Sequence, residues 1–299
     1  MKSERLAGLL YGLGAAVIWG GFPVVTRFGV TNSGLDMYDV TFIRFAVASL
    51  LTFPVLVKGR WPDWRVTGLL TLGIGAPYIL VVSDGLARAP VALFAVLTPT
   101  SMVLFSACLG SWALGDRLGR WQLGGIAAIC IGSTIAATAL TGFRGSSSAL
   151  GLFIAGGALW ALYTVVAKGA GLNAWVATAA VSATSMVAYG LPYLTIRGFA
   201  FLDHPWQGLV VQALYQGALV SVVALFCYSK AVLLLGASIG ACFAALVPAM
   251  AMVGGLLLLG EVPSPVSALG LGMSTLGIGA VLLAPSRSTE ASRPAASAT

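Results

Sequence analysis

The feature that most constrains this chain is a series of mainly apolar stretches from Leu6 to Ala284, separated only by short polar breaks. A helix needs about 20 consecutive apolar residues to cross the hydrocarbon core of a bilayer. Charged residues make up 8% of the chain, against roughly 25% in soluble domains. The sequence therefore predicts an all-α integral membrane protein whose helices face lipid.

We expect ten transmembrane helices, because the breaks between apolar stretches are rich in the Gly, Pro, Asn and Ser residues typical of turns. The expected spans cover residues 7–28, 38–57, 66–87, 90–114, 121–140, 150–170, 174–196, 206–233, 237–259 and 265–284. The remaining residues, 285–299, are rich in Ser, Ala and Pro. This composition predicts a disordered cytoplasmic tail.

The distribution of Lys and Arg predicts how the chain is oriented, because cytoplasmic loops are enriched in both. With the N-terminus inside, four basic residues fall on the outer side, namely Arg27, Arg88, Arg144 and Arg197, and eleven of the 16 fall on the inner side. The charge pattern thus places both termini in the cytoplasm. We expect a multi-pass protein of the plasma membrane, specifically a bacterial inner membrane.

The two halves of the chain resemble each other. Trp19 matches Trp160 at an offset of 141, Gly132 matches Gly277 at an offset of 145, and a proline recurs in the fourth span of each half. The repeating unit is five helices long, so the second copy must enter the membrane with inverted orientation. The sequence predicts a first repeat over residues 1–140, a linker loop over 141–149 and a second, inverted repeat over 150–284. Inverted repeats are a transporter architecture, with the substrate site between the copies.

Several motifs in this order resemble the EamA-type branch of the drug/metabolite transporter superfamily. They are the Trp19-Gly20-Gly21-Phe22-Pro23 end of the first span, Arg44 in the second, and the blocks from Pro99 to Gly115-Asp116 and from Pro248 to Gly260-Glu261. That branch includes bacterial amino-acid exporters. The resemblance covers nearly the whole chain, and it implies export of small metabolites such as amino acids.

Three prolines are candidates for the transport pathway. Pro99 and Pro248 lie inside apolar spans, where each removes one backbone hydrogen bond and frees a carbonyl group. Exposed backbone at membrane depth is tolerated only against protein or a wet cavity. We expect both to line the pathway or to flex during gating, with a simple packing kink as the alternative. Pro23 joins them from the motif at the end of the first span.

Four aromatic residues are further candidates, because they lie within apolar spans and away from the membrane interfaces where aromatic anchors are common. They are Trp19, Tyr78, Trp160 and Tyr163. In a cavity, such rings can hold an apolar side chain or a cation. Packing in the protein core is the alternative for each of them. Tyr215, with Gln212 and Gln216, could add hydrogen bonds.

Two charged residues are candidates for gating or coupling, because charges within membrane spans are often functional. Arg44 is near the outer end of the second span, and we expect it to snorkel or to pair with Asp36 or Asp39. Asp84 is four residues before Arg88, the spacing of an intrahelical ion pair. It is also the best candidate for a proton-linked carboxylate.

The sequence predicts no catalytic residue, metal site or cofactor. The four cysteines have no metal-binding spacing, and the chain has no phosphate-binding loop for ATP. Gly236–Gly240 matches G-x-S-x-G, but that motif needs a strand-turn-helix context and a histidine partner. The only histidine, His204, is in an expected external loop. Basic residues are too scattered to indicate nucleic-acid binding.

The sequence thus favours a secondary transporter, monomeric in the bilayer, that moves a small solute by alternating access through a cavity between the repeats. A cavity with few fixed charges suits neutral or zwitterionic solutes and is poorly suited to phosphorylated ones. Efflux of amphipathic cations or drugs is the alternative within transport. An intramembrane enzyme, a channel and a sensor are alternatives from other classes.

Overall fold

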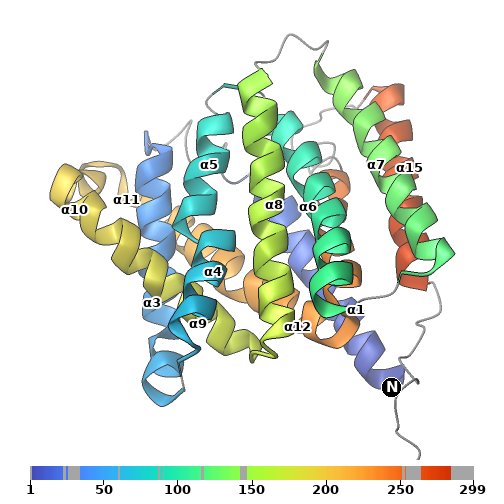
Figure 1. Cartoon of the computed structure of the whole chain (residues 1–299). Coiled ribbons are helices and arrows are strands. Elements are labelled where there is room, and N and C mark those ends of the chain that lie inside the picture. Colours follow the sequence, from blue (N-terminus) through green and yellow to red (C-terminus); the bar gives the residue numbers. More distant parts are fainter. Residues whose placement is uncertain are drawn as a thin grey trace, which may run out of the picture.

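The described part of the chain is entirely helical (Figure 1). The computed structural model describes residues 2–22, 25, 34–59, 61–86, 88–89, 91–115, 118–141, 147–250, 253 and 264–283. The expected all-α class is confirmed for these residues. The expected tail and part of the expected linker loop lie outside them.

The first half of the chain contains long helices, one of which is broken. Its elements are α1 (Lys2–Gly20), α3 (Met37–Lys58), α4 (Trp64–Ile74), α5 (Ala76–Leu86), α6 (Val91–Leu114) and α7 (Arg120–Thr141). Helices α4 and α5 follow each other within one expected span and are separated by Gly75. The third expected span is therefore two short helices.

The second half contains more irregular helices. Its elements are α8 (Ser147–Gly169), α9 (Ala174–Ser185), η1 (Met186–Gly190), α10 (Leu191–Arg197), η2 (Ala200–Asp203), α11 (Trp206–Gln212), η3 (Ala213–Ala224), α12 (Leu225–Leu235), α13 (Ala237–Cys242), η4 (Phe243–Leu246) and α15 (Pro265–Leu283). Elements η1 and η3 are π-helical, whereas η2 and η4 are 3₁₀ helices. The expected seventh and eighth spans are continuous helical stretches that include these π segments.

Seven helical stretches of the described residues are long and apolar enough to cross a membrane. They correspond to the second through eighth expected spans. The last two expected spans match shorter apolar helices, Ala237–Met250 and Pro265–Val281, and the first matches α1. Membrane spans are thus confirmed, whereas the number ten stays a prediction.

Side-chain caps explain where several helices begin. Asp36 accepts hydrogen bonds from the backbone N–H groups of Tyr38 and Asp39, and Asp39 accepts one from the backbone of Asp36. This reciprocal arrangement satisfies donors that have no partner within the helix. Asp63 and Asn173 cap α4 and α9 in the simpler way.

Helices α7 and α15, which end the two predicted repeats, pack side by side at one edge of the molecule (Figure 1). Glycines of each helix lie against the backbone of the other helix. A Cβ on Gly277 would lie 2.6 Å from the carbonyl oxygen of Gly125, and a Cβ on Gly270 would lie 2.5 Å from that of Gly132. Small residues of this kind let helix backbones approach closely. The pairing runs in opposite directions along the two helices, as an inverted repeat requires.

We expect Gly270→Leu to destabilise the folded protein, because the new side chain would meet the backbone of α7, which cannot move aside alone. Overpacking of this kind costs about 1–3 kcal/mol. The melting temperature of the purified protein in detergent measures the effect. Gly272→Leu is the matched control, since nothing lies within 4 Å of a Cβ there. Equal melting temperatures for the two variants would contradict the close contact.

Candidate functional site

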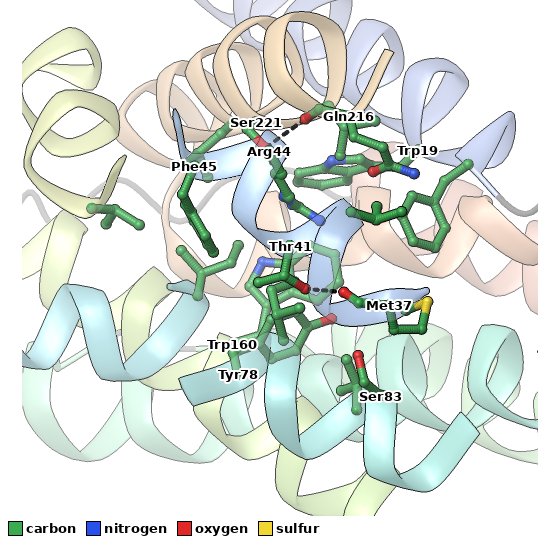
Figure 2. A pocket seen from close by; sticks show the side chains of 18 of the residues that line it. Trp19, Met37, Thr41, Arg44, Phe45, Tyr78, Ser83, Trp160, Gln216 and Ser221 are labelled. Carbon is green, nitrogen blue, oxygen red and sulfur yellow. Dashed lines mark hydrogen bonds between the residues drawn. The ribbon is translucent and has the colours of Figure 1, made fainter. Parts of the chain in front are cut away.

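A cavity of about 90 Å³ lies among helices of both halves of the chain (Figure 2). This is several times the space that one water molecule needs. Both halves of the chain line it. The lining residues are Trp19, Phe22, Met37, Val40, Thr41, Arg44, Phe45, Ile74, Tyr78, Ile79, Val82, Ser83, Phe94, Pro99, Trp160, Val181, Ser182, Gln216, Val220, Ser221, Leu225 and Val247. The cavity therefore lies between the two predicted repeats.

Irregular backbone surrounds this cavity. The interruption at Gly75 separates Ile74 from the N-terminus of α5, whose first N–H, on Ala76, donates to Ser185 Oγ at 3.1 Å. The π-helical segment η3 contributes Gln216 and Ser221 to the wall. Broken helices and π-bulges are common at transport and other functional sites.

Trp19 and Trp160, matched by position in the two repeats, contact each other in the cavity wall. Their ring centroids lie 4.9 Å apart, with the rings nearly perpendicular. Tyr78 approaches Trp160 with centroids 5.8 Å apart, and all three residues are buried. These three rings give the cavity wall an apolar surface.

Behind this aromatic wall, helices α8 and α12 are joined by two short hydrogen bonds. The hydroxyls of Tyr163 and Ser229 lie 2.6 Å apart, as do those of Thr164 and Tyr228. We call these four residues the α8–α12 layer. Tyr228 also contacts Trp19, with ring centroids 5.3 Å apart. The layer packs against the two tryptophans through Tyr228, and Tyr163 lies within it and not among the residues that line the cavity.

Arg44 extends into the cavity from the N-terminal half of α3 (Figure 2). Its Nε donates a hydrogen bond to Ser221 Oγ at 2.6 Å, and Ser221 in turn donates to the carbonyl of Gln216. The guanidinium also lies 5.9 Å from the ring centroid of Phe45. The expected pairing of Arg44 with Asp36 or Asp39 is wrong.

Both carboxylates instead bind Arg197, at the end of α10. Arg197 Nη1 lies 2.5 Å from Asp36 Oδ2 and 3.4 Å from Asp39 Oδ1, and Tyr193 donates to Asp39 at 2.6 Å. We call these four residues the Arg197 cluster. Burial raises the pKa of Asp36, but hydrogen bonds from the backbone of Asp39 and from Arg197 outweigh it, so this pKa lies below its ordinary value.

Acid is expected to weaken the Arg197 cluster. The pKa of Asp36 is lower in the folded protein than its ordinary value of 3.8. The ionised carboxylate therefore stabilises the folded state fully above pH 3.8, and this stabilisation is lost as the pH falls through the lowered pKa. The melting temperature of the wild type should therefore drop more steeply below roughly pH 4 than that of Arg197→Gln, by a few degrees at most. Arg88→Gln, which breaks another surface pair, should keep the wild-type profile. Identical profiles for Arg197→Gln and the wild type would contradict the role of Asp36.

The other predicted site residues have varied positions. Pro99 is buried and lines the cavity, whereas Pro248 is buried beside the lining residue Val247. Asp84 pairs with Arg88 at 2.8 Å on an exposed surface, as its spacing indicated. Pro23 lies outside the described residues.

Sequence reasoning missed several polar residues of the wall, among them Thr41, Ser182 and Ser221. Hydroxyl groups within apolar spans are too common to single out these three, and only the packing of α3 against η3 brings Arg44 and Ser221 together. No group of His, Cys, Asp or Glu in the described ranges could hold a metal ion.

Comparison with known proteins agrees with this geometry. The model of the EamA-like transporter family matches residues 6–138 and again residues 147–283. The chain belongs to the EamA-like transporter family. Two matches in one chain show the repeat, and membership shows a membrane transporter of the drug/metabolite superfamily, as the motifs indicated.

Solved structures show the same fold. One solved chain, described as "Crystal structure of protein", aligns with a TM-score of 0.72 and 19% identity, over 92% of this chain and 98% of that one. At this identity the likeness concerns the fold alone. A comparison with curated proteins finds no match.

Proposed function

We propose that this EamA-like protein is a secondary transporter that exports small metabolites, with amino acids as its main substrates. The observation that supports this most is the central cavity, which both repeats line and which combines an apolar aromatic wall with a few polar groups. Ligand sites have this composition. Alternating access then means that the two repeats rock against each other around the cavity.

The polar and apolar parts of the wall suit an amino acid with an apolar side chain. Trp19, Tyr78 and Trp160 offer ring surface, and Arg44 extends into the same cavity (Figure 2). Efflux of lipophilic cations is the second candidate, because aromatic rings attract cations. The positive charge of Arg44 in the same cavity opposes that function.

Orientation and direction complete the proposal. With both termini in the cytoplasm, as the Lys and Arg distribution predicts, the lining residues of α3, from Met37 to Phe45, belong to the outer half of that helix. The family resemblance favours export, driven by the gradient of the solute itself or of a coupled ion. We propose a monomer in the plasma membrane, because one chain supplies both repeats.

Counterflow in liposomes tests the function. Liposomes that contain the purified protein are loaded with unlabelled leucine, phenylalanine or threonine and diluted into the radiolabelled form without ATP. We expect saturable entry of at least one of these amino acids above that in protein-free liposomes. Entry of tetraphenylphosphonium alone would instead favour the cation alternative. If nothing enters under any imposed gradient, the proposed substrates are wrong.

A further inference from the structure

Arg44 is a charged group held in an apolar span with little compensation. Helix α3 carries no other charge between Asp39 and Lys58. The side chain of Arg44 is partly buried, and its single described hydrogen bond uses Nε, which donates to Ser221. A guanidinium has five N–H donors, so the two terminal amino groups keep theirs for another partner.

No carboxylate in the described ranges neutralises this charge. Asp36 and Asp39 bind Arg197, and Asp84 binds Arg88. These three carboxylates therefore form ion pairs with other arginines and not with Arg44. An unpaired charge at membrane depth costs several kcal/mol. A negatively charged ligand beside the guanidinium would offset that cost.

A residue of the cavity wall carries a second donor that has no described partner. The indole N–H of Trp160 is buried and has no hydrogen-bond acceptor among the described residues. Arg44 and Trp160 belong to different repeats and both line the cavity. The described part of the lining contains no Asp or Glu.

We propose that Arg44 binds the carboxylate group of the transported solute, while the aromatic wall holds the apolar part. This inference rests on the proposed function, because it names the chemical class of its substrate. A guanidinium can bind a carboxylate through two parallel hydrogen bonds, and such pairs are strong and directional. Ser221 fixes the guanidinium through Nε and leaves its terminal groups for the ligand.

The same geometry favours a ligand whose acidic group carries a single negative charge. Among the described residues that line the cavity, Arg44 is the only Lys or Arg, whereas a phosphate group carries up to two negative charges and would need further cations. Monocarboxylates and zwitterionic amino acids therefore fit, and organic phosphates do not. Removing the carboxylate from an amino acid should remove most of its affinity.

Paired ligands test this directly on the purified wild-type protein in detergent. Leucine, phenylalanine and threonine are compared with leucinamide, phenylalaninamide and threoninamide by ligand-induced thermal shift. We expect at least one acid to bind at least tenfold more tightly than its amide. Equal affinity of each acid and its amide, or no binding by any of the acids, would overturn the proposal without the use of any variant.

Variants then assign the effect to the side chain. Arg44→Gln should lose the preference for the acid, and Arg44→Lys should keep part of it, because a lysine retains the charge but not the two-bond geometry. Arg88→Gln, which removes an exposed arginine, is the control and should behave as the wild type. A folded Arg44→Gln that keeps the full preference would refute the assignment.

The thermal-shift and counterflow results distinguish failure of the carboxylate site from failure of the proposed transport. An acid that binds through Arg44 but does not move in counterflow supports the site and contradicts the proposed transport of amino acids. Acids and amides that both move, in the wild type and in Arg44→Gln alike, support transport and contradict the carboxylate site.

Discussion

Trp160→Ala is expected to raise the KM for the transported amino acid at least about tenfold, which corresponds to a loss of roughly 1.4 kcal/mol. Trp160 contacts Trp19 and Tyr78 in the cavity wall and presents its N–H without an acceptor. The substitution removes both apolar area and a donor from the site, and it also leaves Trp19 without its perpendicular partner.

Counterflow at a series of solute concentrations measures this effect. Trp112→Ala is the matched control, because Trp112 is 85% exposed on α6 and faces away from the cavity. It should leave the KM unchanged. Trp160→Phe, which keeps ring area but loses the N–H, separates apolar contact from hydrogen bonding. A folded Trp160→Ala protein with the wild-type KM would remove Trp160 from the site.

Gly75→Ala is expected to lower the melting temperature strongly and to reduce transport at least about tenfold. A Cβ at Gly75 would collide with Ser185 Oγ and with the carbonyl oxygen of Thr71. Ser185 accepts the first N–H of α5, so any shift that relieves the collision also disturbs the start of that helix. Tyr78, one turn later, would move with it.

The matched control is on the preceding helix. Gly68 lies within α4, and a Cβ there would meet nothing within 4 Å. Gly68→Ala should leave transport intact and raise stability by about 0.5–1 kcal/mol, because alanine favours the helix over glycine. If Gly75→Ala melts and transports as Gly68→Ala does, the break at Gly75 has no functional role.

Much of the architecture could be predicted from the sequence because burial in lipid depends on local composition. Seven of the expected spans are confirmed on length and apolar character alone, and the family match confirms the duplication. Trp19 and Trp160 could be singled out because they lie within apolar spans, away from the membrane interfaces, and at matched positions of the two halves. The structure brings their rings into contact.

Side-chain contacts between helices that are far apart in the sequence could not be predicted from composition. Arg44 seemed close enough to Asp36 and Asp39 on its own chain segment, yet its partner Ser221 lies 177 residues away. Arg197, which binds both carboxylates, lies 161 residues from Asp36 and 158 from Asp39. The break at Gly75 and the π-helical η3 escaped prediction too, because each depends on packing against neighbouring helices and not on local propensity.

The rings that cross between the two repeats have a consequence for how the conformations of the proposed transporter are populated. Trp19 of the first repeat contacts Trp160 and Tyr228 of the second, and each such aromatic contact contributes about 0.5–1.5 kcal/mol. The proposed rocking of the repeats would change these contacts, whereas the hydrogen bonds of the α8–α12 layer lie within the second repeat and would be kept. A difference of a few kcal/mol leaves the minor state at roughly 0.1–10% of molecules, and a solute redistributes the two states by no more than its difference in affinity for them.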